Sequence, residues 1–190
     1  AAFYLGHRLS EDFDLFTGVG ELVRPLGIRF GEALERQRFQ VRITRNFESF
    51  YESTVSKDQD SLKIQLAQDS PYRLATALMS DYGVAVDDLE DVAANKLLAL
   101  SGRWTPRDFF DVFMLIETKQ SDLKTMIDNA AKKDPGFDLY YLALAFEKAK
   151  DLPDKITDLP LMPLVDFSIT ALKTYFATNA TSLLKKSRKK

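Results

Sequence analysis

The chain has 190 residues, enough for one domain or two small ones. Its 45% hydrophobic and 28% charged residues exclude a disordered chain. The absence of cysteine excludes a disulfide framework and a thiolate zinc site. No apolar run reaches the length of about 18 residues that a membrane-spanning helix needs, so no membrane span is expected.

Charge is distributed unevenly along the chain. Lys and Arg number 26 and Asp and Glu 28, for a net charge of −2. Five basic side chains lie in the last six residues, 185–190, and removing them takes the net charge from −2 to −7. A basic tail can contact nucleic acid, and it can equally be a solvated chain end.

The first part of the chain has the two-residue period of strands. Phe13 and Leu15, for example, alternate with two aspartates. Single helical turns are predicted at 21–25 and 31–36. Strands are predicted over residues 12–15, 39–44, 47–55, 62–67 and 84–86.

From Asp87 on, the apolar period changes to that of helices. Asp87 and Glu90 predict a capping box, and Gly102 is placed as a helix-ending glycine. Thr105 before Pro106 predicts the start of the next helix. Helices are predicted over residues 87–102, 105–116, 123–132, 139–149 and 165–177.

A small mixed sheet followed by a helical C-terminal half predicts an α+β fold. We place the α/β core in residues 1–86, the helical half packed on it in 87–184 and the basic tail in 185–190.

Asp12 and Asp14 form the first candidate site. Residues two apart on a strand point to the same face, with Cα atoms about 6.6–6.8 Å apart. Two carboxylates so placed can hold a hard cation such as Mg²⁺, which takes oxygen ligands and assists phosphoryl-type transfer. Two aspartates on a solvated strand face would give the same pattern, so the pair by itself leaves both interpretations open.

Three blocks of sequence are spaced as in a known family. The first reads Gly6-His7-Arg8-Leu9-Ser10-Glu11-Asp12-Phe13-Asp14-Leu15-Phe16. The second holds Lys96, Arg103, Pro106-Arg107-Asp108 and Asp111, and the third Asp158-Leu159-Pro160 with Met162-Pro163. Together they resemble the nucleotidyltransferase toxins of the AbiEii/AbiGii type, a branch of the polymerase-β-like nucleotidyltransferase superfamily. The resemblance extends from Gly6 to about Phe176, most of the chain.

The resemblance implies a nucleotidyltransferase-like fold and assigns roles to individual residues. Asp12 and Asp14 would be catalytic and would bind Mg²⁺, with Mn²⁺ as the alternative metal. Lys96 and Asp111 would complete the catalytic set. The residues that would bind the nucleotide are His7, Arg8, Ser10, Arg103 and Arg107.

Several of these residues also have a purely structural interpretation. His7 is the single histidine of the chain and would serve as a surface histidine, and Lys96 as a solvated helix lysine. Asp108 would cap its helix, while Arg107 and Asp111, four residues apart, would form an ion pair. The family interpretation instead makes Asp111 or Asp108 an active-site acid or an orienter of the neighbouring basic residues.

The sequence departs from the family pattern at two places. The glycine-rich segment that cradles phosphates in the superfamily is absent, and we expect a short stretch of chain to be missing between Leu5 and Gly6. Gln65 takes the place of the family's third acid, with Asp69 as the nearest acidic substitute. Glutamine offers a carbonyl oxygen but no charge.

The resemblance implies an enzyme that transfers a nucleoside monophosphate from a nucleoside triphosphate to a hydroxyl group of RNA, such as tRNA, or of a protein. It also implies a bacterial toxin in the cytoplasm, with a cognate antitoxin as partner. The two departures favour an alternative, a catalytically inactive member that keeps the fold and serves in binding or regulation.

Overall fold

The computed structural model describes residues 1–10, 12–70 and 72–187. It confirms the α+β class, with a small mixed sheet followed by a helical C-terminal half. The chain forms two compact units. The sheet unit is Ser10–Tyr72, and the helical unit combines Ala1–Leu9 with the chain from Arg73 onward. These boundaries differ from the division that we placed at residue 86, because the first nine residues and residues 73–86 belong with the helices.

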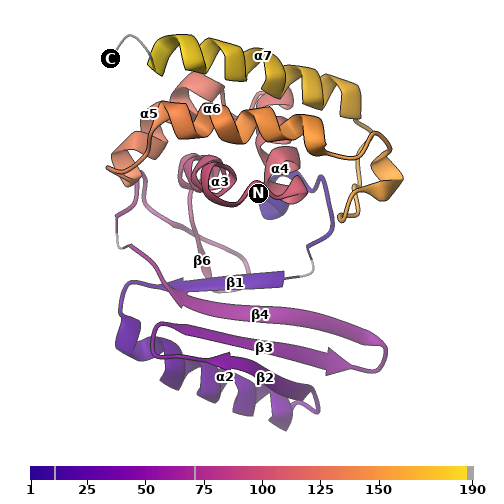
Figure 1. Ribbon diagram of the computed structural model, residues 1–190. Coiled ribbons are helices and arrows are strands. Elements are labelled where there is room, and N and C mark those ends of the chain that lie inside the picture. The colour runs from indigo at the N-terminus through magenta and orange to yellow at the C-terminus, as the bar shows by residue number, and fades with distance from the viewer. Residues whose placement is uncertain (11, 71, 188–190) are drawn as a thin grey trace. The chain divides into compact units, whose positions relative to one another are not determined.

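The sheet unit is a four-stranded mixed sheet with one long helix on it (Figure 1). The strand order is β1-β4-β3-β2, with β1 parallel to β4 and the other pairs antiparallel. The long helix, α2, covers one face and packs on the three strands other than β1. The elements are β1 (Asp12–Thr17), a 3-10 turn (Gly20–Leu22), α2 (Val23–Arg36), β2 (Gln40–Asn46), β3 (Phe50–Lys57) and β4 (Asp60–Gln68).

Helix α2 corrects the prediction of two separate turns. Pro25 lies in its first turn, where a residue without an amide hydrogen breaks no helical hydrogen bond. Gly27 and Gly31 lie on the face that meets the buried ring of Tyr51. Their lack of a side chain lets helix and sheet approach closely, a packing reason for glycine that local sequence does not reveal.

Replacing Gly27 by alanine is expected to lower the free energy of unfolding of the sheet unit by about 1–3 kcal/mol, the usual cost of overpacking. The new Cβ would lie 2.4 Å from Cγ of Tyr51, closer than real contacts allow. Gly102→Ala is the matched control, because its Cβ would meet nothing within 4 Å and the helix gains about 1 kcal/mol of propensity. Urea unfolding measures both changes; a Gly27→Ala protein as stable as wild type would contradict this packing.

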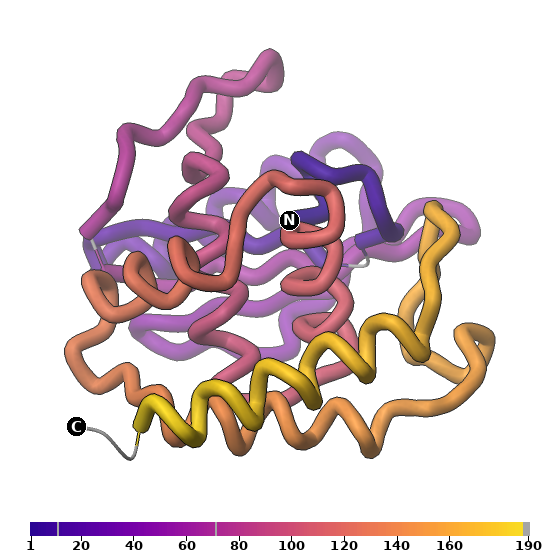
Figure 2. Tube along the Cα trace, turned by 90° about the horizontal axis from the view of Figure 1, so that it is seen from above, coloured from indigo at the N-terminus to yellow at the C-terminus, as the bar shows by residue number. Residues whose placement is uncertain are grey.

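The helical unit is built around the almost fully buried helix α4. Figures 1 and 2 show α7 running alongside α6, and the two helices pack closely. The rings of Phe109 and Phe146, both buried, meet Phe176 edge to face. The elements are α1 (Ala2–Leu5), β5 (Leu78–Met79), β6 (Ala85–Val86), α3 (Leu89–Arg103), α4 (Pro106–Glu117), α5 (Leu123–Lys133), α6 (Leu139–Glu147), two 3-10 turns (Lys148–Asp151 and Ile156–Asp158) and α7 (Ile169–Ser187).

The start of α3 differs from the predicted capping box. Asp88, rather than Asp87, is the N-cap, and its Oδ1 accepts a hydrogen bond from the Glu90 amide at 2.8 Å. The carboxylate of Asp87 is instead bound to Arg73 Nε at 2.7 Å. The predicted edge strand, at β6, pairs with β5 in a separate two-stranded sheet.

The ends of other helices follow the prediction only in part. Thr105 is confirmed as the N-cap of α4. Helix α3 runs through Gly102, and Trp104 takes the left-handed position after it, with φ 53°. The last helix begins at Ile169, later than predicted, because Ser168 Oγ accepts a hydrogen bond from a first-turn amide.

Gly6 follows α1 directly as a helix cap. Its φ is 57°, in the left-handed region that glycine adopts without strain, and its amide donates to the carbonyl of Ala2 at 2.8 Å. That additional residues belong between Leu5 and Gly6 stays a prediction. Among the described residues, no helix combines the length and the hydropathy that crossing a membrane requires.

Candidate functional site

The paired aspartates lie on the predicted strand. β1 carries Asp12 and Asp14 two residues apart, so both carboxylates leave the same face of the sheet. Leu15 points to the other face and packs in the small core under α2. Ser10 Oγ donates to Asp12 Oδ1 at 3.2 Å, which ties the predicted nucleotide-binding serine to the first aspartate.

Strand pairing brings further polar residues to this face. Asp14 lies opposite Gln65 of β4, and Gln65 lies opposite Glu52 of β3. Lys63 lies opposite Asp12 in the same way. Sequence reasoning missed Glu52 and Lys63 because the register of the strands, rather than sequence spacing, places them there.

Glu52 is held firmly on this face. Its side chain accepts hydrogen bonds from Thr44 Oγ1 and from Gln65 Nε2, each 2.7 Å long, and the residue is 8% exposed. The Thr44 hydrogen bond, and after it the Gln65 hydrogen bond, lower the pKa of Glu52 below its ordinary value despite the burial. Glu52 is therefore an ionised carboxylate at neutral pH.

The donor atoms on this face fit Mg²⁺ or Mn²⁺. The carboxylates of Asp12 and Asp14 are hard oxygen ligands, and Mg²⁺ needs only one or two of them when substrate phosphates and water complete its shell. Zinc would favour nitrogen or sulfur ligands. The described residues contain no group of three or more His, Cys, Asp or Glu side chains placed to hold a metal. A cation here would thus depend on the aspartate pair, on other oxygens and on its substrate.

A second set of predicted residues meets in the helical unit. Asp111 of α4 is fully buried and binds three basic side chains, and we call these four residues the Asp111 cluster. His7 Nε2 lies 2.7 Å from Asp111 Oδ1, and Lys96 Nζ lies 2.8 Å from Oδ2. Arg8 makes a fork, with Nε 2.7 Å from Oδ1 and Nη2 3.0 Å from Oδ2. The structure thus joins residues more than a hundred positions apart in the sequence.

A strand-like contact fixes the N-terminal half of this cluster. Arg8 forms an isolated antiparallel bridge with Pro163. The Leu9 amide donates to the carbonyl of Met162 at 3.0 Å, and the Leu164 amide donates to that of His7 at 2.8 Å. Residues 162–163 of the third block of the family resemblance therefore hold the His7-Arg8 segment next to α4.

The charges of the Asp111 cluster stabilise one another. Burial alone would raise the pKa of Asp111, but hydrogen bonds from His7 and Arg8 and the charge of Lys96 hold it far below its ordinary value. Because an ionised carboxylate only accepts, His7 Nε2 is the donor of their hydrogen bond. His7 Nδ1 is buried without a hydrogen-bond partner in the part of the chain that the structure describes. His7 is thus a core residue and not the surface histidine of the alternative interpretation.

Asp108 lies beside this cluster. Its amide donates to Thr105 Oγ1 at the start of α4, so Thr105, rather than Asp108, is the cap. Its carboxylate accepts two hydrogen bonds from Arg103, at 2.7 and 2.8 Å, and lies 3.9 Å from Lys96 Nζ. Arg107, the second residue of α4, follows the helix-starting proline. Of the basic residues that contact Asp108 or Asp111, Arg103 and Lys96 have the most exposed side chains, at 61% and 22%.

Another buried ion pair in the helical unit escaped sequence reasoning. Asp91 of α3 is fully buried, binds Lys133 of α5, and accepts hydrogen bonds from the backbone amides of Leu74 and Ala75. These bonds also lower the pKa of Asp91, although burial opposes them. Asp91 thereby holds residues 74–75, at the start of the helical part of the chain, next to α3, so the role of this ion pair is structural.

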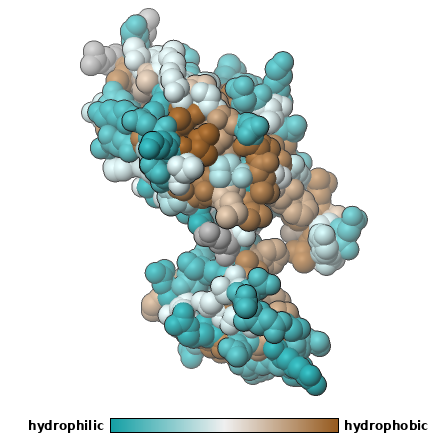
Figure 3. Space-filling view, turned by 90° about the vertical axis from the view of Figure 1, so that its right-hand side faces the viewer, coloured by the Kyte–Doolittle hydropathy of each residue, from teal (hydrophilic) through white to brown (hydrophobic). Residues whose placement is uncertain are grey.

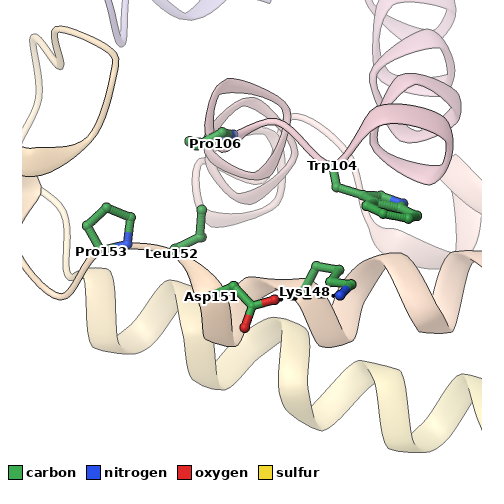
Figure 4. A pocket seen from close by; sticks show the side chains of 6 residues that line it. All are labelled: Trp104, Pro106, Lys148, Asp151, Leu152 and Pro153. Atoms are coloured by element: carbon green, nitrogen blue, oxygen red, sulfur yellow. Dashed lines mark ion pairs between the residues drawn. The ribbon is translucent and has the colours of Figure 1, made fainter.

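The described residues of the helical unit line at least two pockets, and neither of these two contains a predicted site residue. Figure 4 shows Trp104, Lys148 and Asp151 around the first, a pocket of about 300 Å³ in which Lys148 pairs with Asp151 at 3.7 Å. The second, of about 520 Å³, lies along residues 156–166. Figure 3 shows apolar patches on the surface of this unit. Met162 of the second pocket is 58% exposed.

A mixed sheet with an Asp-x-Asp strand, followed by a helical half, agrees with the fold that the family resemblance implies. The family model described as "Nucleotidyl transferase AbiEii toxin, Type IV TA system" matches residues 1–172. This chain belongs to the AbiEii nucleotidyltransferase toxin family.

A solved structure supports the fold. The crystal structure of JHP933 from Helicobacter pylori is similar with a TM-score of 0.51 and 18% sequence identity, over 96% of this chain and 78% of that chain. At this identity the likeness concerns the fold alone. A comparison with curated protein sequences gives no match.

Proposed function

We propose that this protein is a Mg²⁺-dependent nucleotidyltransferase that moves a nucleoside monophosphate from a nucleoside triphosphate to a hydroxyl group of RNA or protein. The observation that carries the proposal is the placement of Asp12 and Asp14 on one face of a strand in a chain of the AbiEii family. In the proposed reaction the acceptor oxygen bonds to the α-phosphorus and the bond from that phosphorus to the bridging oxygen breaks. Pyrophosphate leaves, and the hydroxyl proton passes to solvent.

The sheet unit would supply the metal ligands. When bound, Mg²⁺ neutralises phosphate charge and helps to align the acceptor with the leaving group. Asp12 and Asp14 would hold the ion, while Ser10 orients Asp12 through their hydrogen bond. Lys63, on the same face beside Asp12, adds a positive charge for the phosphates.

The helical unit carries the basic residues that the family resemblance assigns to phosphate binding. Lys96 and Arg103 are the most exposed of its clustered bases, and they are therefore the ones a phosphate can reach. Asp111 and Asp108 orient these two bases. Arg8 is 7% exposed and donates two hydrogen bonds to Asp111. These two hydrogen bonds would have to break before Arg8 could bind a phosphate.

Incubation with labelled nucleoside triphosphates tests the proposal directly. Purified protein, Mg²⁺ and either tRNA or a protein extract should yield a labelled acceptor and pyrophosphate in equal amounts. Chelation of the metal with EDTA is expected to abolish labelling, and added Mg²⁺ or Mn²⁺ to restore it, because the phosphate charges then again have a counter-ion. Labelling that persists in excess EDTA would contradict metal dependence.

A second function is favoured by one observation, the neutral Gln65 in place of the family's third acid. In that case the protein binds triphosphates without transferring them and serves a regulatory role. Calorimetry distinguishes the two functions, since triphosphate binding with no labelled acceptor and no pyrophosphate would favour the second.

Membership of a type IV toxin–antitoxin family leads us to propose an antitoxin as the partner of this chain. Growth arrest on expression in a bacterial host, relieved by the neighbouring gene, would be the expected behaviour of such a toxin.

A further inference from the structure

Three residues form a row across the polar face of the sheet. Asp14 on β1, Gln65 on β4 and Glu52 on β3 are direct partners in the strand register. Directly paired residues share a face, and adjacent strands lie about 4.7–4.9 Å apart. Gln65 therefore lies between Asp14 and Glu52 in the sheet, with its side chain on the same face.

Chemistry determines which way this amide is turned. Gln65 Nε2 donates a hydrogen bond to Glu52 Oε2 at 2.7 Å, so the nitrogen of this amide faces Glu52. The amide oxygen branches from the same planar carbon and therefore points away from Glu52. Among the described residues, no group donates a hydrogen bond to that oxygen.

Glu52 itself is fixed in place. Thr44 Oγ1 donates both to the Glu52 carboxylate, at 2.7 Å, and to its backbone carbonyl, at 3.2 Å. Arg45 Nε adds a positive charge 3.9 Å from the carboxylate. A glutamate so held cannot easily turn away, and the orientation of Gln65 follows from it.

We propose that Glu52 is a positioning residue that turns the oxygen of Gln65 toward Asp14, so that Gln65 supplies a neutral oxygen ligand where the family has a third carboxylate. The inference rests on the proposed function, since it concerns the same cation. Gln65 is then an adapted ligand rather than a sign of lost activity. Amide carbonyl oxygens are accepted ligands of hard cations, although a neutral ligand contributes less attraction than a carboxylate.

Binding of Mn²⁺ alone, followed by the electron paramagnetic resonance signal of the free ion, tests this inference without any need for catalysis. Outer residues that orient a metal ligand typically contribute tenfold or more to affinity. Glu52→Gln is therefore expected to weaken Mn²⁺ binding about tenfold, because an amide at position 52 can accept or donate and leaves Gln65 free to flip. Gln65→Ala should weaken it by a similar factor.

The double variant Glu52→Gln/Gln65→Ala separates positioning from general electrostatics. If Glu52 acts through Gln65, the double variant binds Mn²⁺ as tightly as Gln65→Ala alone. If Glu52 merely attracts cations by its charge, the second substitution weakens binding further, and the inference is overturned. Glu48→Gln, at an exposed site just before β3, is the control for loss of one charge and should bind like wild type. Circular dichroism of each variant checks that it is folded.

Asp14→Asn distinguishes this inference from the function on which it rests. Wild-type affinity in Asp14→Asn would overturn both, whereas no Mn²⁺ binding by wild type in the absence of triphosphate would overturn the inference alone. Loss of binding in Asp14→Asn together with wild-type affinity in Glu52→Gln and Gln65→Ala would overturn the positioning role alone.

Discussion

Replacing Asp111 by asparagine should lower the free energy of unfolding of the helical unit by about 3–5 kcal/mol, the usual cost of breaking a buried ion pair by removing one partner. In wild type the Asp111 carboxylate is fully buried and balances the charges of Arg8 and Lys96. Asparagine has nearly the same shape but no charge. The variant would leave the two cations without their shared counter-ion, and one of them, Arg8, is itself buried.

Urea unfolding followed by the helical circular dichroism signal measures this effect. Asp151→Asn is the control, because Asp151 is 59% exposed and pairs only loosely with Lys148, at 3.7 Å. Such surface pairs contribute at most about 1 kcal/mol, so the control should unfold almost like wild type. A loss below about 1 kcal/mol for Asp111→Asn would show that the cluster is not a stabilising network.

The effect should also depend on pH with a defined sign. The pKa of Asp111 is lower in the folded protein than its ordinary value of 3.8. The unfolded state therefore binds a proton more readily, and the stability that Asp111 contributes is complete above about pH 5. It is lost as the pH falls below about 4, so the gap between wild type and Asp111→Asn should be constant from pH 5 to 7 and should shrink toward pH 3. A gap that widens in acid would contradict this assignment.

Replacing Asp14 by asparagine should reduce nucleotide transfer at least about a hundredfold, because a metal ligand contributes several kcal/mol to the transition state. The substitution keeps the shape of the side chain and removes the charge that would bind the cation. Asp14 is exposed on its strand, so the fold should be preserved. Initial rates of label transfer at saturating triphosphate give the comparison.

The control for Asp14→Asn is Asp60→Asn, the same change at an exposed aspartate that begins β4. It should transfer label at the wild-type rate, and both variants should melt close to wild type. Equal rates in wild type and Asp14→Asn would remove Asp14 from the catalytic site and leave the binding function of the fold as the better account.

Local sequence predicted those elements whose signals are themselves local. The alternation around Phe13 and Leu15 predicted β1, and it placed Asp12 and Asp14 on one face. Thr105 marked the start of α4 because its hydroxyl binds an amide only three residues away. Such signals survive in any tertiary context and can be found in the sequence alone.

Sequence rules for helix caps and helix breaks failed where a distant residue determined the outcome. Asp87 and Asp88 are equal as caps in the sequence, and Arg73 decided between them by binding Asp87. Only two separate turns were predicted at 21–25 and 31–36, whereas α2 is continuous and meets the ring of Tyr51 at Gly27 and Gly31. These outcomes depend on residues that lie far away along the chain.

What the sequence determined by itself was the class of fold, the family, and the identity of the residues that carry charge. Only the tertiary structure decided which charges meet: it joined His7 and Arg8 to Asp111, and it set Gln65 between Asp14 and Glu52. The physical reason is that spacing fixes contacts only within a turn or a strand. Strand register and helix packing, set by the burial of apolar surface across the whole unit, fix the rest.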